Sequence, residues 1–251
     1  MIPLRDVIPS RTVPFVTYII IMLNAAGWLL ELSMSPQQLN LLLTQYGVVP
    51  AELRPITLVT SMFLHGGWFH VIGNMWFLWI FGDNVEDAFG HGRFVVFYLL
   101  CGMTAAFGQI IMEPYSLLPT IGASGAIAGV MGAYFVLYPR SRVLTLIPPF
   151  LFHVVEVPAI FLLGFWFVMQ LLNAGAVAVT SNSGGGVAFA AHVAGFVVGM
   201  VGVVLFRKRE RFGVWPNDPR VKNVPAAQYG EDVRKWLTHQ AIRYAKRRAA
   251  A

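Results

Sequence analysis

Residues 122–138 read GASGAIAGVMGAYFVLY, an apolar stretch of small residues that opens on a serine and is closed by Pro139. From Ser124 to Tyr138 a helix has 15 residues, or about 22 Å at about 1.5 Å per residue, against about 30 Å of membrane hydrocarbon. Ser124 would therefore lie about 8 Å below one membrane surface, at the positively polarised start of a helix. Close helix packing is the alternative reason for so many glycines.

The rest of the chain has the composition of an integral membrane protein. Apolar residues make up 57% of the 251 and charged residues only 12%, whereas soluble domains carry about 25% charged residues. Hydropathy predicts an all-α membrane protein with six transmembrane helices. The predicted spans are 15–32, 65–82, 94–112, 124–138, 158–179 and 187–206. We accordingly divide the chain into an N-terminal segment at 1–14, a six-helix domain at 15–206 and a basic tail at 207–251.

The basic residues predict the orientation of these spans. If both termini are cytoplasmic, Arg54 is the one basic residue in the connectors that lies outside, as positive-inside bias favours. Those facing the cytoplasm are then Arg5, Arg11, Arg93, Arg140, Arg142, Arg207, Lys208, Arg209 and Arg211. The same bias accounts for the net charge of +6 without a nucleic-acid partner. In the tail, 228–248 could lie as an amphipathic helix on anionic lipids or remain solvated.

A histidine in the last span matches the serine in depth. His192, in the fragment AHVAG at 191–195, is the sixth residue of its span and so lies about 7.5 Å from the outer surface. Its helix face is otherwise made of small residues, which permits close approach of another helix: Ala188, Gly195, Gly199 and Gly202. A structural hydrogen bond is the alternative role, but the matched depths favour a Ser124/His192 pair for acyl transfer.

No carboxylate lies between Glu156 and Glu210. We therefore expect a Ser/His dyad without an acidic third member, whose imidazole is oriented by packing or by the backbone. In the second span, His70 and Asn74 are spaced i, i+4 within HVIGN and share one helix face. They either hydrogen-bond between helices or, with a serine nucleophile nearby, donate to the oxyanion that forms in the reaction.

Metal and cofactor chemistry are not expected. The single cysteine, Cys101, lies within a span and excludes a cysteine cluster. The sequence also contains no HExxH motif and no glycine-rich phosphate loop followed by lysine. Between the first two spans, residues 33–64 form a connector of 32 residues, too long for a simple turn. We predict a partly helical loop in the outer membrane interface.

These motifs together resemble the rhomboid family of intramembrane serine proteases. The matching features are HxxxN in the second span, GxSG opening the fourth and AHxxG in the sixth, with Trp68 and the segment GDNVEDAFG at 82–90. Within that segment, Glu86 and Gly90 fit the family pattern. The resemblance covers about 54–206 and implies the six-helix, rhomboid-like core of bacterial members, in a bacterial inner membrane. It implies membrane lipids and transmembrane protein substrates as partners.

By position, the family implies Ser124 as the nucleophile and His192 as the base. His70, Asn74 and the backbone around Ser124, including Gly122, would form the oxyanion site. His65 matches a loop histidine of structural character, the connector 33–64 matches a membrane-embedded loop, and the fifth span matches a mobile gate. Ala128 departs from the pattern, because some relatives carry there an aromatic residue that stacks on the catalytic imidazole.

Two other functions would also fit such a bundle. A catalytically inactive rhomboid-like protein that binds or dislocates membrane proteins would share the fold, but it usually lacks the serine or the histidine. A small transporter would tolerate the polar residues within the spans, which are Asn24, Gln109, Gln170 and Asn173. It would also favour paired half-helices or internal symmetry, and we find neither in the sequence. The motifs therefore favour an intramembrane endopeptidase that cuts transmembrane segments near their outer ends.

Overall fold

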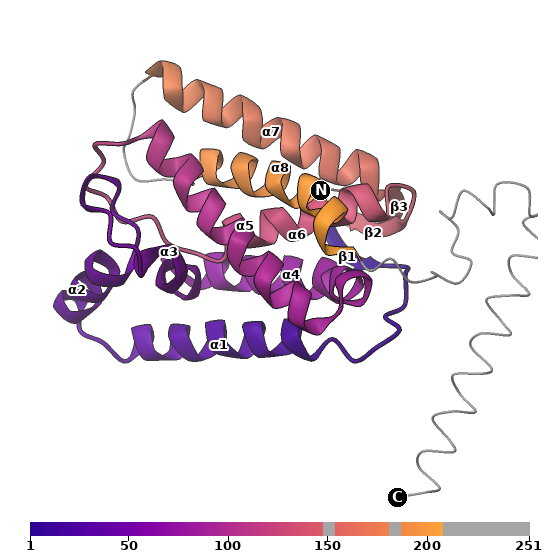
Figure 1. The fold of residues 1–251 in the computed structure, drawn as a ribbon, viewed down its shortest axis with the longest axis horizontal. Helices are drawn as coiled ribbons and strands as arrows, with labels where there is room; N and C mark the ends of the chain where they lie inside the picture. The colour runs from indigo at the N-terminus through magenta and orange to yellow at the C-terminus, as the bar shows by residue number, and fades with distance from the viewer. Residues whose placement is uncertain (148–153, 181–186, 208–251) are drawn as a thin grey trace, which may run out of the picture. The chain divides into compact units, whose positions relative to one another are not determined.

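The computed structural model describes residues 1–147, 154–180 and 187–207, which are mostly helical (Figure 1). The α-helices are α1 (Phe15–Leu32), α2 (Pro36–Tyr46), α3 (Thr57–Thr60), α4 (Trp68–Phe89), α5 (His91–Met112), α6 (Ser124–Leu137), α7 (Ala159–Thr180) and α8 (Phe189–Phe206). Single 3-10 turns lie at Pro50–Glu52 and Ser61–Phe63. The strands are β1 (Ile2–Asp6), β2 (Arg142–Leu146) and β3 (Val154–Pro158). Apart from Arg207, the predicted basic tail lies outside the described residues.

Each predicted span contains a helix, and the largest difference in bounds concerns α4. This helix begins at Trp68 rather than His65 and continues to Phe89 rather than ending at Gly82. Hydropathy missed its last two turns because they carry three carboxylates, which lower the local average. Two of these carboxylates, Glu86 and Asp87, accept hydrogen bonds from residues around the start of α1, and the third, Asp83, accepts from its neighbour Asn84. The predicted partly helical character of the connector 33–64 is confirmed by α2 and α3.

Carboxylates hold both ends of α1. Glu86 of α4 is fully buried and accepts hydrogen bonds from the N–H groups of Val16 (3.1 Å) and Thr17 (2.8 Å). These donors belong to the first turn of α1, where N–H groups have no partner inside the helix and attract negative charge. At the other end of α1, Glu31 accepts from the backbone N–H of His65 at 3.0 Å. Helix α1 is thus bonded to α4 at its start and to the segment just before α4 at its end.

Helix α6 lies at the centre of the bundle and packs directly on α8. Its residues from Gly125 to Tyr134 are all buried. A Cβ atom on Gly199 would overlap the carbonyl oxygen of Gly129, and one on Gly195 would overlap that of Gly125. Only glycine permits the two backbones to come this close. The predicted close approach along the small-residue face of α8 is therefore confirmed.

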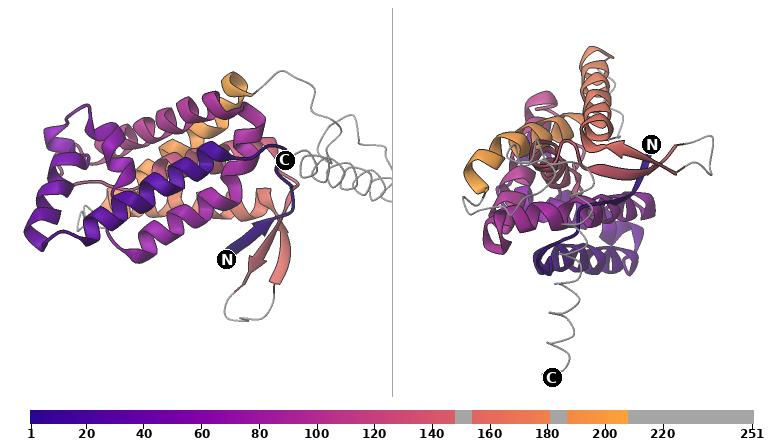
Figure 2. Two further views of the ribbon diagram at one scale, coloured as in Figure 1. Left: turned by 90° about the horizontal axis from the view of Figure 1, so that it is seen from below. Right: turned by 90° about the vertical axis from the view of Figure 1, so that its right-hand side faces the viewer.

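A small antiparallel sheet lies at the end of the bundle opposite α2 and α3 (Figures 1 and 2). Its strand order is β1-β2-β3, with Thr145 paired to both Pro3 and Val155. The carboxyl group of Asp6 accepts hydrogen bonds from Asn84 of α4 and Tyr134 of α6, both at 2.9 Å. The sheet therefore connects the start of the chain to α4 and α6, at the ends of these helices that lie away from Ser124.

In the described part of the chain, four helices are long and apolar enough to cross a membrane: α1, α5, α7 and α8. Helix α6 is apolar but has only 14 residues. Helix α4 has 22 residues, but it is absent from this group and carries three carboxylates in its last two turns. The chain is a helical membrane protein.

Candidate active site

The loop before α6 fixes the position of Ser124. In this loop, Thr120 forms a two-way backbone bridge with Val48 of the connector after α2, at 3.0 and 2.8 Å. The N–H of Gly122 donates to the carbonyl of Ser61 at 2.8 Å. Gly122 has φ +116°, a conformation that favours glycine. A Cβ atom there would also lie 2.5 Å from Nε2 of His70. The shape of the loop thus requires glycine at position 122, and the N–H of Gly122 is already hydrogen-bonded to Ser61.

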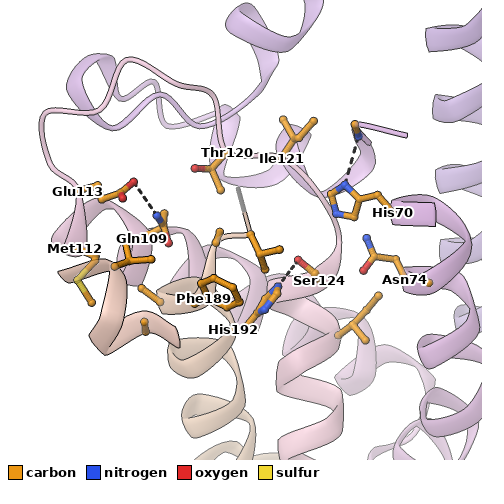
Figure 3. A pocket seen from close by; sticks show the side chains of 18 of the residues that line it. His70, Asn74, Gln109, Met112, Glu113, Thr120, Ile121, Ser124, Phe189 and His192 are labelled. Atoms are coloured by element: carbon orange, nitrogen blue, oxygen red, sulfur yellow. Dashed lines mark hydrogen bonds between the residues drawn. The ribbon is translucent and has the colours of Figure 1, made fainter. Parts of the chain in front are cut away.

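Ser124 and His192 lie within hydrogen-bonding distance at the starts of two packed helices. Ser124 is the first residue of α6, and His192 is the fourth of α8. Ser124 Oγ lies 2.8 Å from His192 Nε2 (Figure 3). His192 is 9% exposed, so few water molecules compete for this contact. The glycine contacts between α6 and α8 explain how two residues 68 positions apart come together.

The imidazole of His192 has a second partner that we did not expect. Nδ1 of His192 lies 2.9 Å from Oε1 of Gln170, a residue of α7. The ring of Trp166, one turn earlier on α7, lies with its centroid 5.8 Å from that of His192. Packing against the imidazole is thus present, as expected, through Trp166, but the expectation omitted the hydrogen-bond partner Gln170. The sequence showed Gln170 as a polar residue within a span, but not which helix it faces.

His70 and Asn74 lie on the opposite side of Ser124 from His192 (Figure 3). The N–H of Gly66 donates to Nδ1 of His70 at 3.4 Å, so a neutral His70 carries its proton on Nε2. This Nε2 is the atom beside Gly122. Asn74 Nδ2 lies 3.0 Å from Nε2 of His65, whose ring is buried. His65 thus holds the Asn74 amide in place, a role that the sequence did not reveal.

These side chains line one cavity of about 1020 Å³. Its walls come from α4 to α8 and the loop before α6, and they include His70, Asn74, Ser124 and His192. The volume is at the upper end of the range for small-molecule sites, about 300–1,000 Å³, so a short extended peptide would fit. Among the described residues, no three His, Cys, Asp or Glu side chains are grouped so that they could hold a metal ion.

A family model described as the Rhomboid domain matches residues 52–209. The chain belongs to the rhomboid family. It is 42% identical over 76 residues to Rhomboid protease GluP of Bacillus subtilis, covering 30% of this chain and 14% of that protein. With Putative rhomboid protease YdcA of the same organism it shares 32% identity over 127 residues, 49% of this chain and 62% of the relative.

A mitochondrial member is also similar. Rhomboid protein 1 of Saccharomyces cerevisiae is 27% identical over 150 residues, which cover 58% of this chain and 40% of that protein. The chain thus spans between 14% and 62% of the length of these three relatives. The family contains proteins named as proteases and proteins named only rhomboid-like.

Within this rhomboid chain, the site departs from the expected pattern at Ala128. Ala128 is fully buried in α6 and has no ring to place against His192. The aromatic side chain beside the imidazole comes instead from α7, as Trp166, with its plane tilted by 35°. The aromatic neighbour is therefore supplied by a different helix.

Proposed function

We propose that this chain is an intramembrane serine endopeptidase that cleaves transmembrane segments of membrane proteins near their outer ends. The observation that carries the proposal is the 2.8 Å contact between Ser124 Oγ and His192 Nε2 in the wall of a cavity of peptide-sized volume. A serine hydroxyl is a weak nucleophile unless a base within about 2.6–3.2 Å takes its proton. Membership of a family that includes proteases supports the same reaction.

In the first half of the reaction, Oγ of Ser124 attacks the carbonyl carbon of the scissile peptide and its proton passes to Nε2 of His192. When the tetrahedral intermediate collapses, the C–N bond breaks and His192 gives this proton to the leaving amine. Water then attacks the acyl-serine ester, with His192 again as the base. The carboxylic acid leaves and the Ser124 hydroxyl is restored.

The negative oxygen of the intermediate needs donors opposite His192. Nε2–H of His70 and the amide of Asn74 lie on that side of Ser124 (Figure 3). The N–H of Ser124 adds a third donor, because the first residues of a helix have no partner inside it. Gly122, whose own N–H is bonded to Ser61, contributes by leaving room for His70. Such preorganised donors are worth about 2.7–4 kcal/mol each.

The proposed topology has six membrane-crossing helices, α1 and α4 to α8, between a cytoplasmic segment at 1–14 and a cytoplasmic tail at 207–251. Helices α1, α5, α7 and α8 meet the length and composition expected of spans. The shortness of α6, with 14 residues, supports a site recessed below the outer surface. We place the protein in a bacterial inner membrane, with membrane lipids and transmembrane substrates as its partners.

The contacts of the polar residues favour a protease over a transporter. In the described structure, Gln170 contacts His192 and Gln109 donates to Glu113. Asn24 and Asn173 each donate to a carbonyl of their own helix. An inactive binding protein would share the fold, and the Ser124–His192 contact is what favours catalysis over binding alone.

The test is cleavage of a model transmembrane substrate by the purified chain in liposomes. Ser124→Ala and His192→Ala should each abolish cleavage, and a serine-directed phosphonate should label the unmodified chain at Ser124. Ser33→Ala, which alters an exposed serine at the end of α1, is the matched control and should keep full activity. Undiminished cleavage by a folded Ser124→Ala variant would refute the proposal.

A further inference from the structure

Gln170 makes a contact that determines how His192 can act. The imidazole is bonded at both nitrogens, Nε2 to Ser124 at 2.8 Å and Nδ1 to Gln170 Oε1 at 2.9 Å. A neutral imidazole has one N–H donor and one acceptor nitrogen. Because an amide oxygen only accepts, Nδ1 carries the proton and Nε2 is left to accept from the serine hydroxyl. This tautomer is the one in which His192 can serve as a base.

We propose that Gln170 is a positioning residue, which holds His192 in the tautomer that activates Ser124. The inference rests on the proposed protease function and adds to it a residue that acts through His192. Without Gln170, the proton could move to Nε2, and the ring would then donate to Ser124 instead of accepting from it. The fraction of molecules with His192 in the active tautomer would fall, while the substrate site would stay intact.

The groups around His192 leave this role to Gln170. Helix α6 contributes Ser124, and α7 contributes Trp166 and Gln170. Another titratable side chain of the site, His70 of α4, lies across Ser124 (Figure 3). In the described residues no carboxylate is hydrogen-bonded to His192. An amide suits this position, because an ionised carboxylate within a membrane is costly to bury.

Helix α7 presents this amide from a defined face. Trp166, Gln170 and Ala174 are spaced i, i+4, i+8 and therefore share one side of the helix. Trp166 and Ala174 line the cavity, so the side that carries Gln170 faces the site. The next polar residue of α7, Asn173, is half-buried, does not line the cavity and donates to the carbonyl of Met169 of its own helix at 2.6 Å. Asn173 therefore offers a matched control of similar chemistry outside the site.

The experiment compares three variants in the liposome cleavage assay. Gln170→Leu should lower kcat by about 10- to 100-fold with KM nearly unchanged, as for other groups that orient a histidine. Gln170→Glu keeps an accepting oxygen and should retain most of the activity. The acid limb of its pH profile should move to higher pH, because the carboxylate and the protonated imidazole stabilise each other as a pair. Asn173→Leu should leave kcat and the pH profile unchanged.

A second measurement does not depend on activity. The imidazole nitrogen chemical shifts of His192 should show a proton on Nδ1 in the unmodified chain and a mixture of tautomers in Gln170→Leu. Unchanged shifts and kcat in that variant would overturn the role of Gln170, as would a proton on Nε2 in the unmodified chain. If instead the unmodified chain neither cleaved substrate nor reacted with the phosphonate, the protease function would fail, whatever the shifts.

Discussion

Asn74 combines a structural contact with a proposed catalytic role. Its Nδ2 lies 3.0 Å from Nε2 of buried His65, and this contact fixes the plane of the amide. The side chain also lines the cavity beside Ser124, where an N–H can reach the developing oxyanion. Since the oxyanion exists only after attack, a donor to it acts on turnover more than on substrate binding.

We therefore expect Asn74→Ala to lower kcat by about a hundredfold while KM changes little. His70 keeps its own donor on the same side, which limits the loss. Steady-state cleavage kinetics in liposomes measure both constants. The control is Asn24→Ala, a buried asparagine of α1 that does not line the cavity. A kcat equal to that of the unmodified chain would assign Asn74 to structure alone.

At the scale of single residues, the sequence predicted those site members that are chemically unusual in their surroundings. A serine and two histidines stand out in apolar spans because polar groups there need a purpose. The structure brings Ser124, His192, His70 and Asn74 to one cavity. The partnership of Gln170 with His192 was not predictable, because it depends on the rotation and tilt of α7. The occupied N–H of Gly122 likewise follows from a contact between distant loops.

At the scale of elements, hydropathy predicted the spanning helices, because long apolar segments give a strong signal. The sheet gave no such signal. Its strands have five residues each, and β1 contains Pro3, which weakens a strand prediction. Pairing across more than 130 positions, as between Ile2 and Leu146, leaves no local trace in the sequence.

One titratable group anchors this sheet. Burial, with the nearby charge of Asp83, raises the pKa of Asp6 from 3.8 to about 7. The unfolded chain therefore releases this proton above about pH 4, while the folded chain keeps it until about pH 7. The stability of the fold should decline across that window and remain lower above it. The shift corresponds to a few kcal/mol, at about 1.4 kcal/mol per pKa unit.

Asp6→Asn should remove this loss, because an amide oxygen can still accept from Asn84 and Tyr134. We expect Tm to rise by about 5 °C at pH 8 and to change little at pH 4.5. Thermal unfolding in detergent across this pH range is the measurement. Glu52→Gln, at an exposed acid of the connector, is the control. Identical pH dependence in Asp6→Asn and the unmodified chain would show that Asp6 is not the titrating group.

At the scale of the whole molecule, the lengths of the helices determine where the proposed reaction would take place. With 14 residues, α6 spans about 21 Å, while the hydrocarbon is about 30 Å thick. If the end of α6 that bonds Asp6 lies at the cytoplasmic surface, Ser124 lies about 9 Å below the outer one. The hydrocarbon holds no water, so water must reach Ser124 through an outward opening of the cavity. A transmembrane substrate must then enter from the side.

An intact substrate helix hides its carbonyl groups in i to i−4 hydrogen bonds, so it must unwind before Ser124 can attack. Favoured substrates should carry Gly or Pro near the outer end of the span, and family resemblance implies a small residue before the scissile bond. Leucines can replace the residues of that outer end, with the scissile pair retained. This change should lower the cleavage rate of a good substrate by about tenfold or more, since each glycine removed stabilises the helix by about 1 kcal/mol. Cleavage rates in liposomes measure this, and leucines placed at the inner end are the control. Equal rates for both leucine-substituted substrates would show that unwinding at the outer end does not limit cleavage.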